Sequence, residues 1–117
     1  MQNENDQAAE KLVIPLFEMV LYPESRTKFG VDAATGNLLL AAMENGETTQ
    51  AIALTVKSGV RAAELTAETL YRTGTLLRLS HLEPADEGYV MVADVVQRIA
   101  ATGIHDVDGR FFAGFCL

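Results

Sequence analysis

The chain has 117 residues, of which 49% are hydrophobic and 21% are charged, and its formal net charge is −7. This length and composition are typical of one globular domain and exclude an intrinsically disordered chain. The acidic excess disfavours nucleic acid as a partner, because phosphate binding is driven by Lys and Arg. No apolar run approaches the roughly 18 residues that cross a bilayer, so no membrane partner is expected.

The N-terminus is polar and lacks the basic start and apolar middle of a secretory signal. Residues 1–10 are therefore predicted to be a disordered polar tail, and residues 11–117 to be the folded domain. The single cysteine, Cys116, can form no internal disulfide, which allows a reducing compartment. We expect a cytoplasmic protein.

Two short strands are predicted first, at Leu12–Leu16 and Thr27–Val31. A turn signal at 22–25 separates them. Proline has no backbone N–H, so Pro15 is expected where the strand faces no hydrogen-bonding partner, and Pro23 is expected to end the strand.

A helix follows, capped by either Asp32 or Thr35 and ending near Asn45, where an Asn-Gly pair is typical of a left-handed cap. Gly36 weakens its first turn. Residues 50–57 then alternate as a third strand.

Residues 58–70 are mostly connection, with one helical turn at Thr66–Leu70, since the TAET stretch looks like a capping box. The connection is long for a compact domain, and long loops often bind something.

The second half is predicted to be β structure, with a long hairpin of 73–82 and 89–99 and a second hairpin around 106–109. The long hairpin is apolar on both faces, with Leu77, Leu79, Met91 and Val95 on one and Leu76, Leu82, Val90, Val92 and Val96 on the other. A sheet with one wet face does not have this pattern, whereas a sheet curled on itself does. We therefore predict a mainly β fold with one or two helices, a small, partly open barrel of about six strands with a helix at one end.

Catalytic and metal-binding motifs are not found. No Gly-Lys pair is available for a phosphate loop. His81 and His105, with one distant cysteine, are a poor zinc set. The Asp-x-Asp-Gly run at 106–109 lacks the closing glutamate of a calcium loop, and Ser58 beside a lysine is better interpreted as a loop than as a catalytic dyad. No cofactor, metal or enzymatic activity is expected.

The order of elements resembles the N-terminal domain of Lon proteases. Ile14-Pro15-Leu16 and Val20-Leu21-Tyr22-Pro23 match the opening of that family, and Leu70-Tyr71 and Gly74-Thr75 match its best-marked block. The resemblance covers residues 11–117. Two departures stand out: Phe17-Glu18 replaces a common Arg-Asp pair, and Ala93-Asp94 replaces a usual Glu-Gly.

The resemblance implies a PUA-like pseudo-barrel with a helix between the second and third strands. In full Lon proteins a helical segment, an ATPase domain and a Ser-Lys protease domain follow, and the parent is a hexamer. The apolar C-terminal end favours a piece of such a protease over a free-standing protein. The implied function is a non-catalytic module that captures unfolded polypeptide and helps assembly, and the isolated domain is expected to be a monomer or weak dimer.

The predicted capture surface is a shallow apolar patch at the barrel rim, because damaged clients expose apolar residues. Its candidate residues are Met19, Leu21, Tyr22, Phe29 and Met91. Methionine adapts to varied partners, which favours the two methionines. The competing interpretation of each residue is an ordinary place in the core.

Two alternatives remain. A stand-alone PUA-like domain that binds a small molecule or RNA predicts a deep pocket or a basic groove. A chiefly architectural role predicts an exposed strand edge that links subunits.

Overall fold

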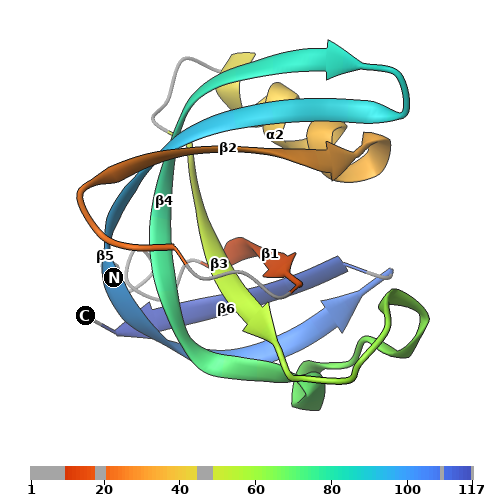
Figure 1. The fold of residues 1–117 in the computed structure, drawn as a ribbon, viewed down its shortest axis with the longest axis vertical. Helices are drawn as coiled ribbons and strands as arrows, with labels where there is room; N and C mark the ends of the chain where they lie inside the picture. Colours follow the sequence, from red (N-terminus) through yellow and green to blue (C-terminus); the bar gives the residue numbers. More distant parts are fainter. Residues whose placement is uncertain (1–9, 18–20, 45–48, 109, 117) are drawn as a thin grey trace, which may run out of the picture.

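The computed structural model describes residues 10–17, 21–44, 49–108 and 110–116 (Figure 1). Strands dominate the described residues. They are β1 (Lys11–Leu16), β2 (Ser25–Asp32), β3 (Gln50–Val56), β4 (Leu70–Ala85), β5 (Gly88–Val107) and β6 (Arg110–Cys116). One helix, α2 (Ala33–Glu44), and two short 3₁₀ turns, η1 (Ala62–Glu64) and η2 (Ala67–Thr69), complete the fold. The predicted mainly β class is confirmed; of the predicted tail, only Glu10 lies within the described residues.

The strands form one six-stranded sheet in the order β2-β5-β4-β3-β1-β6. The sheet closes because the end of β5 also pairs with β6, while the first half of β5 pairs with β2 and β4. The β1–β3 pair is parallel, and the other pairs are antiparallel. The result is a barrel of β1, β3, β4, β5 and β6, extended by β2 and α2, as Figure 1 shows. The predicted small barrel of about six strands is therefore confirmed, with β2 outside the closed part.

Two apolar cores lie on opposite faces of the shared strands. Neighbouring residues alternate between them: Leu77 belongs to the core beneath α2 and β2, and Leu76 belongs to the core inside the closed barrel. In β3, Ala53 and Ile52 divide in the same way. Because one strand can cover two cores, both of its faces are apolar where the cores overlap, as at Leu76 and Leu77. Leu82, predicted on the face of Leu76, instead packs on the core of Leu77, because the β4–β5 register shifts between Leu79 and His81.

Helix α2 begins at a side-chain cap. The backbone N–H of Thr35 donates to Asp32 Oδ1 at 2.8 Å, which decides the predicted alternatives in favour of Asp32. The predicted end at Asn45 lies outside the described residues. Gly36, unfavourable for the helix itself, is required by packing, because an added Cβ would lie 2.0 Å from the Tyr89 ring of β5.

Gly74 allows β4 to approach β3 closely. A Cβ at this position would lie 2.1 Å from the carbonyl oxygen of Ala53, and the β3–β4 register shifts at the adjacent Leu54–Val56 step. β4 and β5 are both longer than the predicted strands at 73–82 and 89–99, and only two residues separate them. β5 continues beyond 99 because its last part pairs with β6. The turn predicted after Thr66 is confirmed as η2.

Candidate functional site

The five residues predicted for the capture surface occupy different environments. Tyr22 is 63% exposed. Phe29 is half-buried and packs on the core beneath α2. Leu21 and Met91 are 8% and 0% exposed, and both are members of that core. Met19 lies outside the described residues. The prediction that Leu21 and Met91 are exposed on a capture surface is therefore wrong. Met91 is buried in the core, opposite its cross-strand partner Phe29 on β2.

Two other aromatic side chains are brought together instead. Phe17 and Tyr71 are 42% and 49% exposed, and they line one hollow of about 230 Å³. Its remaining wall comes from residues 55–60, at the end of β3 and in the loop that follows. We call this hollow, with Phe17, Val56, Lys57, Val60 and Tyr71, the aromatic hollow.

Strand ends create the aromatic hollow. β1 ends at the buried Leu16, so the next residue, Phe17, leaves the sheet. β4 begins with Leu70, whose side chain points into the barrel, and strand alternation turns the side chain of Tyr71 outward. The loop after β3 brings Val60 against the barrel core. The hollow therefore lies where the end of β1, the end of β3 and the start of β4 leave the sheet.

A basic side chain lies beside the aromatic wall. Lys57 Nζ lies 5.9 Å from the centroid of the Tyr71 ring, within the range of a cation–π contact. A second hollow of about 330 Å³ shares Lys57 and Tyr71 and is also lined by Glu68 and Arg72. Tyr71 therefore lines both hollows, and three charged side chains line the second one.

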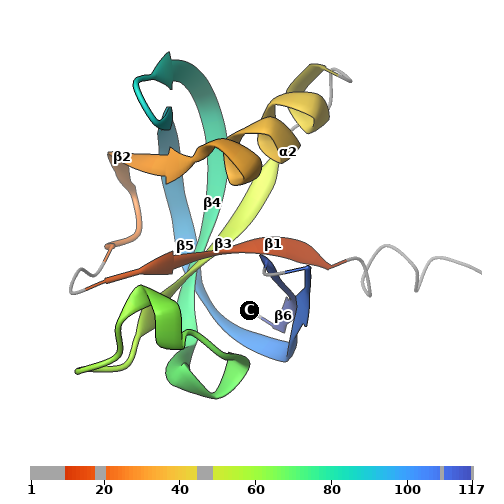
Figure 2. The same ribbon diagram turned by 90° about the vertical axis from the view of Figure 1, so that its right-hand side faces the viewer.

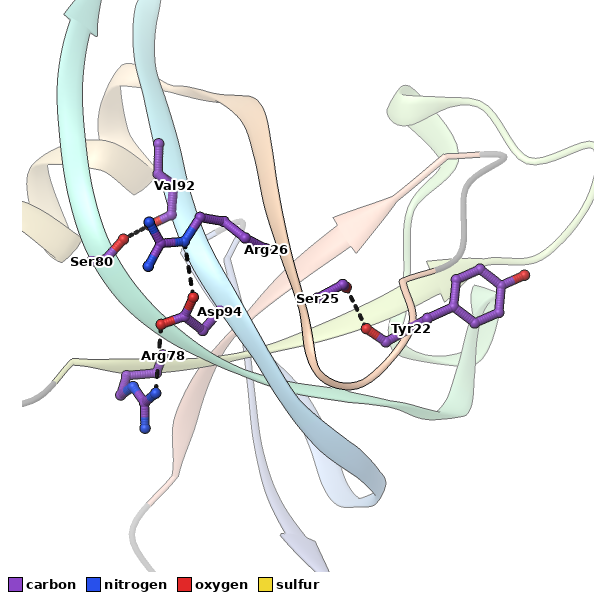
Figure 3. Close-up of polar contacts among 7 residues, drawn as sticks. All are labelled: Tyr22, Ser25, Arg26, Arg78, Ser80, Val92 and Asp94. Atoms are coloured by element: carbon purple, nitrogen blue, oxygen red, sulfur yellow. Dashed lines mark hydrogen bonds and ion pairs between the residues drawn. The ribbon is translucent and has the colours of Figure 1, made fainter.

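Tyr22 lies on the turn that leads into β2. Figure 2 shows this turn on the same side of the molecule as the end of β1 and the loop after β3. Ser25 Oγ donates to the backbone oxygen of Tyr22, and the Tyr22 ring points away from Arg26 and Asp94 (Figure 3). Tyr22 is thus an exposed aromatic residue beyond the aromatic hollow.

The charged cluster is centred on Asp94. Arg26 Nε donates to Asp94 Oδ1 at 3.0 Å, and an Arg78 Nη nitrogen lies 3.5 Å from Oδ2 (Figure 3). The Arg26 hydrogen bond is the main cause that lowers the pKa of Asp94, and Arg78 adds to it. A neighbouring hollow of about 400 Å³ is lined by this cluster and by Glu24, so that two basic and two acidic side chains stand in its wall.

Phe17 and Tyr71 were missed as site residues by sequence reasoning. Tyr71 stands in the best-marked block of the family resemblance, whereas Phe17 is one of the departures from the family pattern. The available signal was alternation: Leu70 and Leu16 read as buried, so each following aromatic residue leaves the core. Alternation alone does not show that the two meet, because their strands are far apart in the sequence.

In residues 10–17, 21–44, 49–108 and 110–116, no three His, Cys, Asp or Glu side chains gather as metal ligands would. The helical segments in these ranges include none that is both long and apolar enough to cross a membrane.

Comparisons with known proteins agree with the fold. The chain is 44% identical over 110 residues to a Lon protease of Methanosarcina barkeri, an alignment that covers 94% of this chain and 14% of that protease. No protein-family model matches the sequence.

Two solved structures have the same fold. The crystal structure of a Lon N-terminal domain protein from Xanthomonas campestris has a TM-score of 0.66 at 17% identity, covering 93% of this chain and 60% of that one. The N-terminal domain of Mycobacterium avium complex Lon protease has a TM-score of 0.63 at 12% identity, covering 92% and 54%. From the Methanosarcina match and this shared fold, we conclude that the chain belongs to the Lon family as an N-terminal-type domain.

Proposed function

We propose that this domain is a non-catalytic recognition module that captures unfolded or damaged polypeptides for an ATP-dependent Lon-type serine protease. The observation that carries the proposal is the pairing of two exposed aromatic side chains, Phe17 and Tyr71, in one hollow. A folded client hides its apolar side chains, and an unfolded one presents them to such a surface.

Each copy of this surface is proposed to bind a client weakly, and capture depends on several copies that bind at once. A hollow of about 230 Å³ accommodates one or two client side chains at a time. In a hexameric parent six copies act together, and a tethered client reaches an effective concentration in the mM range. The domain also helps assembly in this proposal, while on its own it is a monomer or weak dimer.

The rest of the proposed activity belongs to a longer protein, because the chain spans 14% of the length of the Methanosarcina protease. ATP-driven unfolding and hydrolysis are assigned to segments beyond residues 1–117, and the domain itself is proposed to have no enzymatic activity. The proposed compartment is the cytoplasm. Incubation of the purified domain with an unfolded protein and ATP tests the catalytic part, since cleavage would contradict it.

The test of capture is the affinity of the domain for a permanently unfolded, carboxymethylated protein, followed by fluorescence anisotropy. Phe17→Ser and Tyr71→Ser each remove an aromatic contact of about 1–2 kcal/mol, so binding should weaken roughly five- to thirtyfold. The matched control is Leu38→Ser on α2, because Leu38 is 43% exposed and Phe17 is 42% exposed.

If all three variants bind the client as tightly as the parent and keep their fold by circular dichroism, the aromatic hollow is not the capture surface. Loss of binding in Leu38→Ser alone would move the surface to α2. The native, folded form of the same client is the second control and should not bind.

RNA binding has less support. Arg26 and Arg78 line one hollow together with Asp94 and Glu24, two bases against two acids, and Arg61 is paired with Glu64, so these arginines do not form a basic groove. A titration with RNA across salt concentrations should show no affinity at physiological ionic strength. Salt-dependent binding there would favour the alternative of a stand-alone RNA binder.

A further inference from the structure

The outermost strand of the sheet has one unpaired edge. β2 stands at the end of the strand order, and all eight of its residues pair with residues of β5, from Ser25 with Val95 to Asp32 with Gly88. No second strand pairs with β2 in the described part of the chain. In Figure 1, β5 follows one edge of β2, and none of the other strands drawn follows the opposite edge.

The unpaired edge presents hydrogen-bonding groups of the backbone. Successive residues of a strand direct their N–H and C=O groups to opposite edges, so about half of the β2 backbone groups point away from β5. Residues 26–31 make no backbone hydrogen bond away from β5 within the ranges that the structure describes. These groups face water in the free domain and can pair with another extended backbone.

Gly30 exposes this edge at the middle of β2. Because glycine has no side chain, the exposed surface of Gly30 is backbone. The fold does not require glycine here, since its φ is outside the left-handed region and a Cβ would meet its nearest atom, the Tyr89 backbone oxygen, at an ordinary 3.8 Å. Glycine inside a strand often marks a place where another backbone approaches closely, so Gly30 is a second, independent indication of such a chain.

The side chains of β2 define which chain fits. Phe29 and Val31 are half-buried and pack on the core beneath α2, whereas Lys28 is exposed and has no ion pair among the described residues. A strand added beside β2 would place alternate side chains next to Phe29 and the others next to Lys28. The fitting occupant is therefore an extended segment in which apolar residues alternate with polar or acidic ones. Half-buried strands, which a damaged protein exposes, have this pattern.

A second copy of this chain is a poorer occupant. Two chains of net charge −7 repel each other, and an exposed lysine on an edge strand disfavours edge-to-edge pairing of identical strands. A foreign segment of small net charge avoids this repulsion and can still present an acidic side chain to Lys28.

We propose that the outer edge of β2 binds an extended segment of an unfolded polypeptide as an added β-strand. The backbones of the two strands pair with each other, so the contact depends little on the sequence of the segment, and Phe29 and Lys28 favour an alternating one. The inference rests on the proposed capture function and adds to it a second site, separate from the aromatic hollow. The edge holds the backbone of the client, whereas the hollow takes its side chains.

The test is hydrogen exchange of the β2 amides, followed by NMR on the whole chain. The probe is a peptide as long as β2, of alternating Val and Thr with a glutamate at each end. In the free domain, every second amide of residues 26–31 should exchange fast, because it faces water. Peptide at about ten times its Kd should slow the exchange of these amides roughly tenfold, since they exchange only in the unbound domain. Fast exchange that the peptide leaves unchanged would overturn the proposal.

Two controls make the assignment specific. The same peptide with every amide N-methylated keeps its side chains but has no donors, and it should not protect β2; equal protection would contradict strand pairing. Of Thr27 and Lys28, one N–H faces outward, and the exchange of the free domain shows which. Proline at that position, Thr27→Pro or Lys28→Pro, should keep the pairing with β5 and weaken peptide binding at least roughly tenfold. If this variant fails to fold, the methylated peptide still decides.

Two further measurements separate this edge from other sites. Phe17→Ser and Tyr71→Ser should leave the protection of β2 unchanged, so failure of the aromatic hollow and failure of this edge are distinguishable. Loss of protection in either variant would place the peptide in the hollow instead. Protection of β2 that rises with domain concentration in the absence of peptide would assign the edge to a second copy and contradict the proposal.

Discussion

Gly36 of α2 lies directly against the ring of Tyr89 on β5, so closely that a Cβ at position 36 would stand 2.0 Å from Cδ1 of the ring. The Tyr89 hydroxyl donates to Asn37 Oδ1 of the same helix at 2.8 Å. The contact between α2 and the long hairpin therefore depends on a residue with no side chain.

Gly36→Ala should destabilise the domain by about 1–3 kcal/mol, because the new methyl overlaps the Tyr89 ring. Alanine favours a helix over glycine by roughly 1 kcal/mol, which offsets only part of this cost. Urea unfolding measures the difference. The control is Gly30→Ala, where a Cβ would meet its nearest atom, the Tyr89 backbone oxygen, at an ordinary 3.8 Å. A Gly36→Ala variant as stable as the parent would contradict the packing of the ring on the helix.

Gly74→Ala should be more damaging than Gly36→Ala, with a loss of about 3 kcal/mol or more. The added Cβ would meet the backbone oxygen of Ala53 at 2.1 Å, and a backbone carbonyl cannot rotate away as a ring can. Hydrogen exchange should show the first loss of protection in β3 and β4. If Gly74→Ala is instead the more stable of the two alanine variants, the β3 backbone near Ala53 can shift at little cost.

Acidification should remove the contribution of Asp32 to stability. Hydrogen bonds from the Thr35 hydroxyl and backbone N–H lower the pKa of Asp32 below its ordinary value. A depressed folded-state pKa stabilises the fold above the unfolded-state value of about 3.9, and this stabilisation is lost as the pH falls through the lower folded-state pKa.

Asp32→Asn measures this effect, because asparagine caps a helix nearly as well but carries no charge. The parent should be the more stable of the two at pH 7, and the difference between their free energies of unfolding should shrink as the pH falls below about 3.9 and through the lower folded-state pKa. Asp32→Ala loses the cap as well, at about 1 kcal/mol, and should stay less stable at both pH values. A constant difference between Asp32→Asn and the parent would contradict the depressed pKa.

Local patterns predicted most of the fold. The apolar pattern on both faces of the hairpin indicated closure, and the two cores on either side of β4 are its physical cause. The lengths of β4 and β5 were not predictable, because β5 continues to Val107 through its pairing with β6. That pairing is a tertiary contact, and periodicity within one strand carries no information about it.

The candidate site was less predictable for a related reason. Alternation shows that Met91 and Val95 share a face, but when both faces of a ribbon are apolar it does not show which residues reach solvent. Tyr22, predicted from its place in a turn, is exposed. Phe17 and Tyr71 line the same hollow because the end of β1 and the start of β4 both border it. A turn is specified by neighbouring residues and can be predicted from the sequence. The position of one strand end relative to another depends on tertiary structure and cannot.

Replacement of predicted capture residues should separate core from surface. Met91 is 0% exposed, so Met91→Ser leaves a cavity and buries a hydroxyl, and we expect a loss of about 2–5 kcal/mol. Tyr22 is 63% exposed, so Tyr22→Ser should change stability by no more than about 0.5 kcal/mol. Urea unfolding measures both, and anisotropy with the unfolded client is then interpretable only for Tyr22→Ser. If Met91→Ser keeps full stability yet loses client binding, Met91 reaches the surface in a second conformation, and it belongs with Phe17 and Tyr71 rather than with the core.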